Sequence, residues 1–407
     1  MLRITLVALG ALAVGVLAGV GVYRAVVPFP NDAIARGEAF EPENAVWLYQ
    51  HMSEVYPTRH VPRAEVSAPL PVIEGRLEEF TYTHDGKQQP LDALFDNMET
   101  TGLLVLHKGN IVYERYARGA DAGTLFATFS AVKSITSTLV GFAIGDGLID
   151  SVEDPLEKYI PALTGTAYEG VSVRHALQMS SGVLFDADGA AGEDTVEVLT
   201  QTMVLGNKRI NEMSASYPRA HEPGTVFNYN TSETQILLWL VKEVTGKQPA
   251  KYLEEKIWRP LGMDHDAAWN LDNPGPDGME IGGAFFNASL RDLARFGLFI
   301  EQDGIWNGEQ LLPAGWVDEA TRIEEPHLDY GTVFEGFDSG YGYQWWVFPD
   351  GSFRASGAYG QTIYIDRDKD LVVARTSAWP DGYVAESDLE SRAAFAALAD
   401  FLNQPAE

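Results

Sequence analysis

Ser130 and Lys133, three residues apart, are the side chains in this sequence best suited to nucleophilic chemistry. They form its single S-x-x-K pattern. Residues three apart lie side by side on one face of a helix, so the lysine amine could take the proton of the serine hydroxyl. Ser130 lies where a helix is predicted to start, and the free backbone N–H groups there favour developing negative charge. The pair therefore predicts an activated serine nucleophile.

The helix predicted for residues 130–144 is almost wholly apolar, which bears directly on Lys133. No carboxylate lies three or four residues from Lys133, and the next acid downstream is Asp146. A lysine in such a helix either finds a polar partner elsewhere or loses its proton through burial. An isolated S-x-x-K is more often a helix cap followed by a solvated lysine. The apolar helix and the motifs described below favour the catalytic interpretation.

Metal and thiol chemistry has little support in the sequence. There are no cysteines, which excludes disulfides, thiolate metal sites and cysteine nucleophiles. The 8 histidines include no H-x-x-x-H pair, and no G-x-S-x-G segment could recruit one into a triad. His175, on a predicted helix, is interpreted as structural. We expect neither a metal nor a cofactor.

The composition indicates an acidic globular protein. The chain has 407 residues, 45% of them hydrophobic, which is enough for a sizeable core. With 58 acidic and 29 basic side chains the net charge is −29. Nucleic-acid binding requires clustered lysine and arginine, so we expect no nucleic-acid partner. The acidity is typical of a highly soluble surface.

Residues 1–25 contain an uncharged run from Ile4 to Tyr23, flanked by Arg3 and Arg24. About 20 helical residues span about 30 Å, the thickness of a bilayer core. We expect an uncleaved membrane anchor, with a cleaved signal peptide or an internal helix as alternatives. The first two place the rest of the chain outside the inner membrane. We therefore expect an exported protein, anchored in that membrane, with its catalytic part in the periplasm or outside the cell.

The remaining chain divides into a lead-in and one large domain. Residues 26–90 are rich in proline and are predicted to form a stalk and a wrapping segment, with a helix around 45–55. The domain at 91–407 starts with a short helix at 91–97 and strands at 103–107 and 111–116. Helical periods and loops run from residue 130 to about 245, within a predicted helical lobe of about 130–280. The predicted elements after them are a helix at 289–301, strands at 342–348, 352–356, 361–365 and 371–376, and a helix at 386–402. Strands at both ends and helices between them predict an inserted helical lobe.

Further motifs follow Ser130 in a characteristic order: 171–182 (VSVRHALQMSSG), 223–229 (PGTVFNY), 260–263 (PLGM), 291–297 (RDLARFG) and 341–346 (YGYQWW). From about residue 91 onward the chain resembles the serine β-lactamase and penicillin-binding-protein superfamily. It is most similar to the class C-like branch, which includes esterases and 6-aminohexanoate-dimer hydrolases. The resemblance implies an α+β fold: an antiparallel sheet flanked by terminal helices, with an inserted all-helical lobe.

The resemblance also implies roles for individual residues. Ser130 is the nucleophile, and Lys133 and Tyr229 share the role of base, although which of them accepts the proton stays open. Tyr229 then protonates the leaving group. The backbone N–H groups of Ser130 and Ala358 form the oxyanion hole. The implied substrate is a small ester or amide, hydrolysed through an acyl-enzyme.

Two departures from the family pattern affect the predicted substrate. Thr231 occupies the second-motif position that usually carries asparagine, and Ala355-Ser356-Gly357 replaces Lys-Thr-Gly at the third motif. The missing lysine argues against β-lactam and D-Ala-D-Ala turnover. Arg354 could replace it only if it faced the cleft, and alternation along a strand points it to the opposite face.

Two other classes remain open on sequence alone. One is a D,D-carboxypeptidase or β-lactamase of cell-wall metabolism, and the other is a non-catalytic, anchored binding module. The oligomeric state is not predicted.

Overall fold

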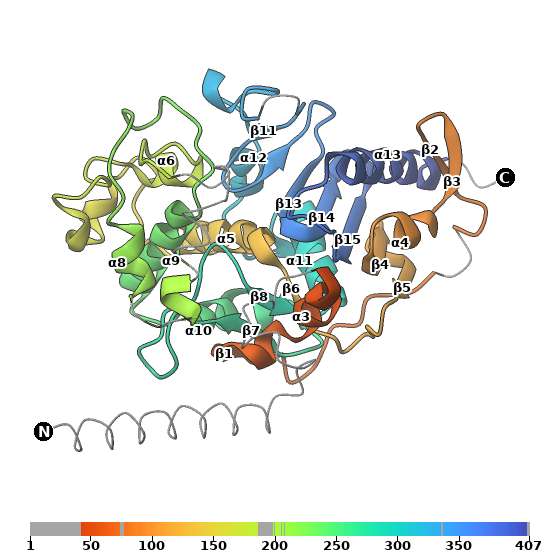
Figure 1. The fold of residues 1–407 in the computed structure, drawn as a ribbon, viewed down its shortest axis with the longest axis horizontal. Helices are drawn as coiled ribbons and strands as arrows, with labels where there is room; N and C mark the ends of the chain where they lie inside the picture. Colours follow the sequence, from red (N-terminus) through yellow and green to blue (C-terminus); the bar gives the residue numbers. More distant parts are fainter. Residues whose placement is uncertain are drawn as a thin grey trace, which may run out of the picture.

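A seven-stranded antiparallel sheet forms the centre of the protein, in the order β11-β12-β13-β14-β15-β4-β5 (Figure 1). The computed structural model describes residues 42–73, 77–185, 198, 200–204, 206, 208–334 and 337–404. The strands are β4 (Thr100–His107), β5 (Asn110–Tyr116), β11 (Gly340–Tyr341), β12 (Trp346–Val347), β13 (Phe353–Gly357), β14 (Gln361–Asp366) and β15 (Leu371–Ser377). β15 pairs with β4, so strands from both ends of the domain lie next to each other, as predicted.

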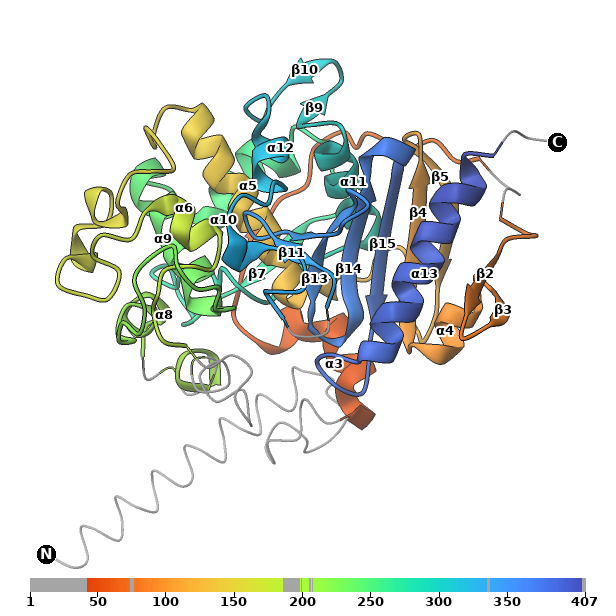
Figure 2. The same ribbon diagram turned by 90° about the horizontal axis from the view of Figure 1, so that it is seen from above.

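Helices cover both faces of this sheet. Helix α13 (Ala385–Leu402) crosses one face, together with α4 (Ala93–Asn97), and α11 (Leu290–Glu301) packs on the other (Figure 2). The alternation along β4 explains this arrangement: Leu103 and Val105 pack with Phe395 of α13, while Leu104 and Leu106 join the larger core.

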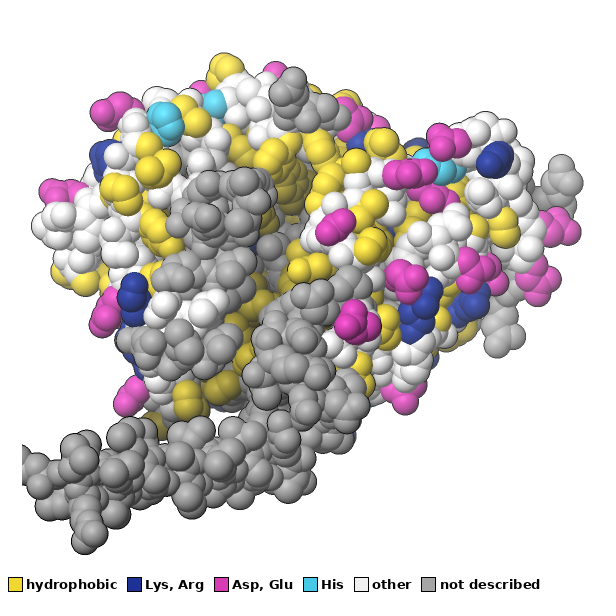
Figure 3. Space-filling view, in the orientation of Figure 1, with side chains coloured by type: hydrophobic (Ala, Val, Ile, Leu, Met, Phe, Trp, Pro, Cys, Tyr) yellow, Lys and Arg dark blue, Asp and Glu magenta, His cyan; other side chains and the backbone are white. Residues whose placement is uncertain are grey.

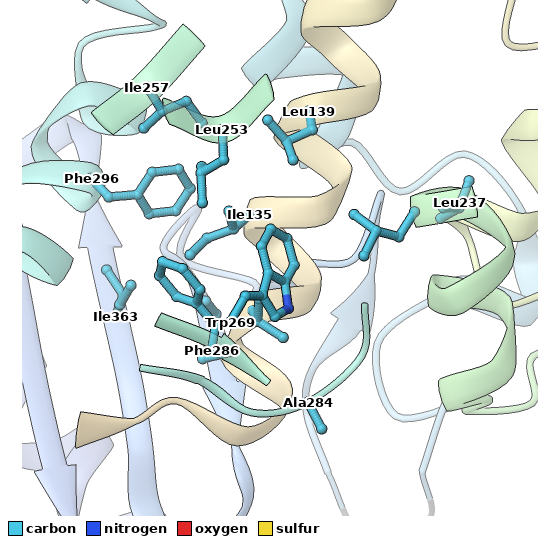
Figure 4. Close-up of a cluster of buried hydrophobic side chains, with 14 of the residues drawn as sticks. Ile135, Leu139, Leu237, Leu253, Ile257, Trp269, Ala284, Phe286, Phe296 and Ile363 are labelled. Atoms are coloured by element: carbon cyan, nitrogen blue, oxygen red, sulfur yellow. The ribbon is translucent and has the colours of Figure 1, made fainter. Parts of the chain in front are cut away.

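The helical lobe packs beside the sheet and encloses α5 (Val132–Gly145). Its other helices are α6 (Val173–Leu177), α8 (Ile210–Ser214), α9 (Thr231–Thr245) and α10 (Pro249–Leu253). Hydrophobic side chains line the hollow between the lobe and the sheet (Figure 3). In the main core, Ile135 and Leu139 of α5 lie among Leu253, Trp269 and other buried residues (Figure 4). The apolar helix predicted around Lys133 is thus the central helix of the molecule, which confirms the predicted α+β fold.

The remaining strands and helices lie outside the central sheet and the helical lobe. They are α3 (Pro42–Val55), β1 (Thr58–Val61), β2 (Thr81–His84), β3 (Lys87–Pro90), β6 (Phe126–Ala127), β7 (Ala267–Asn270), β8 (Phe286–Ala288), β9 (Ile305–Trp306), β10 (Glu309–Gln310) and α12 (Trp316–Ala320). Single turns of 3-10 or π helix are η1 (Phe129–Ala131), η2 (Leu156–Lys158), η3 (Pro161–Leu163), η4 (Thr200–Val204), η5 (Glu254–Trp258), η6 (Pro326–Leu328), η7 (Ala358–Gly360) and η8 (Arg367–Lys369).

The described part of the lead-in is more ordered than the sequence suggested. The helix predicted around 45–55 is present as α3, and β1 joins a second sheet in the order β1-β7-β8-β6. Leu48 and Met52 of α3 are fully buried in the main core. Proline-rich sequence concealed this packing because its partners are distant in the chain: α3 packs against β6, and β1 pairs with β7, more than 200 positions away.

The strand predicted for 342–348 is wrong in its first half. Gln344 has a left-handed backbone (φ 63°), and its N–H donates to the carbonyl of Leu177 in α6. Its side-chain amide donates to the carbonyls of Ala176 and Leu177, and its Oε1 accepts from Thr234 of α9. These tertiary hydrogen bonds take the place of the ladder that the apolar pattern suggested.

The predicted anchor at residues 1–25 lies outside the described residues. Within the described part of the chain, no helix is both long enough and apolar enough to cross a bilayer.

Candidate active site

Ser130 lies in a tight turn, η1, between β6 and the start of α5. The residue before it, Phe129, has a left-handed backbone (φ 45°), which is strained for a bulky side chain. Aromatic packing holds it: the Phe129 ring lies 4.8 Å from Tyr49, 5.5 Å from Phe285 and 5.0 Å from Tyr359, between centroids. The turn presents Ser130 half-buried at the helix start, as the sequence predicted. The supporting rings, including Tyr49 from the lead-in, were not predicted.

The Lys133 amine contacts Ser130 and two further oxygens. Nζ lies 3.0 Å from Oγ of Ser130, 3.2 Å from Oγ1 of Thr231 and 2.6 Å from the carbonyl oxygen of Gly283. The residue is only 2% exposed. The structure therefore brings together Ser130, Lys133 and Thr231, which the sequence singled out, and adds Gly283, which it did not. The Gly282-Gly283 pair in an otherwise apolar stretch was the only local signal for this contact.

These contacts suit a neutral amine. Burial lowers the pKa of Lys133 from 10.5 to about 7, and no described carboxylate forms an ion pair with it. A neutral amine has two N–H donors and one lone pair. The donors can serve Thr231 and the Gly283 carbonyl while the lone pair accepts the Ser130 hydroxyl proton. All three contacts are then satisfied, and the amine is poised to act as a base.

Gly283→Ala is expected to lower kcat by at least about tenfold, because it displaces the lysine. A Cβ at this position would lie 2.6 Å from Cγ2 of Thr231 and 3.1 Å from Nζ of Lys133. Steady-state ester hydrolysis measures the loss. Gly123→Ala, at a position with space around it, is the matched control. Equal activity in the two variants would show that the Gly283 contact does not position the lysine.

The start of α9 places the second-motif residues beside Lys133. Asn230 caps the helix, its side-chain oxygen accepting from the Ser232 N–H at 2.8 Å. Nζ of Lys133 lies 5.1 Å from the ring centroid of Tyr229. The Tyr229 ring is half-buried and packs against Trp346, with centroids 5.6 Å apart. Tyr229 and Thr231 thus lie on either side of the cap residue Asn230, and both approach the lysine.

The end of β13 lies against the turn that carries Ser130. A Cβ on Gly357 would lie 2.2 Å from the Thr128 carbonyl oxygen and 3.1 Å from the Ala131 nitrogen, so only glycine fits there. Ser356 and Ala358 flank this contact and are both half-buried. The third-motif segment therefore adjoins the nucleophile turn, where an oxyanion hole formed by Ser130 and Ala358 would be.

Two other side chains have structural roles. Arg354 is buried, and its guanidinium pairs with Asp388 of α13 at 2.6 Å. It therefore does not replace the third-motif lysine. His175 closes a capping box with Ser172 at the start of α6, which confirms its structural interpretation.

Glu233, in the first turn of α9, is a buried carboxyl to which no sequence motif assigned a role. Its Oε1 accepts from the Ser181 hydroxyl at 2.6 Å, and the residue is 0% exposed. Burial raises its pKa from 4.5 to about 8, so it is mostly neutral at pH 7. The contact ties the Ser180-Ser181-Gly182 turn to the helix that carries Thr231.

Glu233→Gln is expected to remove one pH-dependent component of stability. The folded state keeps the Glu233 proton up to about pH 8, whereas the unfolded chain loses it near 4.5. The contribution of the protonated Glu233 carboxyl to the free energy of unfolding is complete below about pH 4.5. It is lost as the pH rises to 8, a change of a few kcal/mol at most. Urea unfolding between pH 5 and 8 should show wild type losing stability relative to Glu233→Gln. Glu212→Gln, at an exposed position in α8, is the control. Parallel curves for wild type and Glu233→Gln would contradict the prediction.

A possible cation site lies on other elements. Among the described residues, His84, Asp85 and Glu386 form one group whose ligand atoms lie within 4.8 Å of one another. They belong to the β2–β3 hairpin and to α13, and the Asp85 and Glu386 side chains are exposed. None of them contacts Ser130 or Lys133, so the chemistry described above does not depend on this group.

Comparisons with known proteins agree with this geometry. The beta-lactamase family model matches residues 91–398. The 6-aminohexanoate-dimer hydrolase of Paenarthrobacter ureafaciens is 28% identical over 345 residues, covering 82% of this chain and 86% of that protein. A solved structure from Bacillus anthracis, provisionally named as a 6-aminohexanoate-dimer hydrolase, superposes with a TM-score of 0.82 at 26% identity. That alignment covers 91% of this chain and 97% of the other.

More distant structures share the fold. A family VIII carboxylesterase aligns with a TM-score of 0.59 at 19% identity, covering 75% of this chain and 95% of that one. The match to the family spans most of the described chain and includes Ser130, Lys133, Tyr229, Thr231, Gly283 and Gly357. The chain therefore belongs to the beta-lactamase family and is a serine hydrolase that acts on ester or amide substrates.

Proposed function

We propose that Ser130 attacks the substrate carbonyl while Lys133 and Tyr229 share its proton. The Oγ–carbon bond forms as the hydroxyl proton moves to this pair, and the backbone N–H groups of Ser130 and Ala358 hold the oxyanion. The carbonyl then re-forms, the bond to the leaving alcohol or amine breaks, and Tyr229 supplies the proton to it. In the second half of the reaction, water gives a proton to the same pair and attacks the acyl carbonyl. The bond to Ser130 then breaks, Oγ regains its proton, and the acid is released.

The observation that carries this proposal is the set of contacts around the Lys133 amine. It lies 3.0 Å from Oγ of Ser130, and burial holds its pKa near 7. A solvated lysine that merely follows a helix cap would keep its ordinary pKa and face water. The buried amine is costly for the fold, and proton transfer from Ser130 is the function that accounts for it.

The substrate we favour is a small, linear ester or amide. Ala355, in place of the third-motif lysine, is buried and offers no charge to a substrate carboxylate. The relative from Paenarthrobacter ureafaciens is named for hydrolysis of the 6-aminohexanoate dimer, which supports an amide of this size. Thr231 keeps a polar oxygen at the lysine, where an asparagine would otherwise stand.

Intact mass spectrometry tests the proposal. Wild type and Ser130→Ala would each be mixed with a fluorophosphonate, a penicillin and a short acyl ester. We expect a fluorophosphonate adduct on wild type alone, together with ester turnover that vanishes in the variant. A stable or turned-over penicillin adduct would favour the D,D-carboxypeptidase or β-lactamase alternative. Folded protein that no reagent labels would favour a non-catalytic binding module.

We also propose that the protein is exported and held at the inner membrane by residues 1–25. The uncharged run from Ile4 to Tyr23, between two arginines, supports this proposal. Fractionation and protease treatment of spheroplasts should find the hydrolase in the membrane fraction and degrade it from outside. A soluble form whose N-terminus starts after residue 25 would indicate a cleaved signal, and a cytoplasmic, protease-resistant protein would contradict export.

A further inference from the structure

A row of aromatic rings leads away from Tyr229. We call it the aromatic wall; its members are Phe227, Tyr229, Phe334, Phe337, Trp346 and Tyr383. Ring centroids are 5.6 Å apart from Tyr229 to Trp346 and 5.6 Å from Trp346 to Phe334. They are 6.1 Å apart from Phe334 to Phe337 and 5.0 Å from Phe337 to Tyr383.

The wall is assembled from four separate segments. Phe227 and Tyr229 precede α9, Phe334 and Phe337 lie between η6 and β11, Trp346 is in β12, and Tyr383 precedes α13. The rings are only partly covered: Phe334, Phe337 and Trp346 are half-buried, and Tyr383 is 46% exposed. A contiguous, partly exposed aromatic surface that ends at a reactive centre is typical of a binding surface.

The charges beside the wall are already paired. Arg392 is held by Asp338, next to Phe337, and Arg354, opposite Trp346 in the sheet, is held by Asp388. Lys133 lies over the Tyr229 ring but is committed to Ser130, Thr231 and Gly283. A substrate carboxylate on the wall would therefore lose its hydration without gaining a free cation from the described residues around it.

We propose that the aromatic wall binds an uncharged, flat apolar group, such as an aryl ring, in the leaving group of the substrate. The wall begins at Tyr229, the residue assigned to protonate the leaving group, and this places the recognised group on that side of the scissile bond. The inference rests on the proposed function and adds the substrate class to it. Offset and edge-to-face stacking on Trp346 and Phe334 supplies the preference.

Paired acetate esters test the inference, because they share an acyl group and have leaving alcohols of similar acidity. The experiment compares kcat/KM for benzyl acetate, ethyl acetate and 4-carboxybenzyl acetate in wild type, Phe334→Ala, Phe334→Leu and the control Tyr330→Ala. Tyr330 is an exposed aromatic residue near Phe334 in sequence but outside the wall. The benzyl-to-ethyl ratio is taken within each protein, so the amount of folded enzyme cancels.

We expect wild type to prefer the benzyl over the ethyl and the carboxybenzyl ester. Phe334→Ala should lower the benzyl-to-ethyl ratio about tenfold, mainly through KM, and Phe334→Leu less. A ratio that Phe334→Ala leaves unchanged, or that Tyr330→Ala lowers equally, would overturn the inference while leaving Ser130 catalysis intact. If no ester is hydrolysed and a fluorophosphonate does not label Ser130, the proposed function fails and this inference fails with it.

Discussion

Ser130→Ala is expected to lower kcat/KM for an ester substrate by at least about 10⁴-fold. The variant loses the atom that forms the acyl-enzyme, so binding and the oxyanion hole are all that remain for catalysis. The fold should be unaffected, because Ser130 is half-buried in a turn that Phe129 and its aromatic neighbours hold. Steady-state hydrolysis, with rapid-quench detection of the acyl-enzyme, measures the effect.

Ser137→Ala is a matched control for that experiment. Ser137 lies on the same helix, α5, and its buried hydroxyl has no hydrogen-bond partner among the described residues. Removing this hydroxyl leaves the surroundings of Ser130 as they are, so activity should stay within about twofold of wild type. If Ser130→Ala kept wild-type turnover, another nucleophile would have to act, and the mechanism proposed for Ser130 would be abandoned.

Lys133→Met is expected to lower kcat by at least about 10³-fold, the largest effect after that of Ser130. Methionine fills the same apolar space but cannot accept a proton. In wild type, kcat/KM should rise with pH and level off above about 7, because only the neutral amine accepts the Ser130 proton. The variant should lose this rise along with its activity, and stopped-flow measurements between pH 5 and 9 would show it.

The same substitution should make the protein more stable near pH 6. Folding holds the pKa of Lys133 near 7, below the value of 10.5 that it has in the unfolded chain. Burying the charged lysine lowers the free energy of unfolding, and this penalty is complete below about pH 7. It disappears as the pH rises to 10.5, a change of up to several kcal/mol. Lower activity with a higher Tm would identify a functional lysine. A lower Tm in Lys133→Met, with Lys242→Met in α9 unchanged, would instead make it a structural one.

Local spacing in the sequence was sufficient for the part of the site that lies on single elements. Ser130 and Lys133 meet because residues three apart on a helix are neighbours, and the structure places their atoms 3.0 Å apart. Alternation along β13 was likewise sufficient to direct Arg354 to the face opposite that of Ala355, where it meets Asp388 of α13. The apolar run after Ser130 predicted burial of the lysine, and the lysine is 2% exposed.

Other parts of the site depend on contacts between distant segments. The Gly283 carbonyl reaches Lys133 from 150 positions away, and Tyr49 supports Phe129 from a lead-in that looked irregular. Glu233 is buried because α9 packs against the Ser181 turn.

Helical spacing is a property of consecutive residues, so the sequence alone predicted that Ser130 and Lys133 lie side by side. The order of its motifs, through the resemblance to a known family, predicted the fold class and the roles of the two residues. Which carbonyl accepts from the lysine and which rings form the aromatic wall depend on how separate elements pack. No local pattern encodes those contacts, and only the tertiary structure decided them.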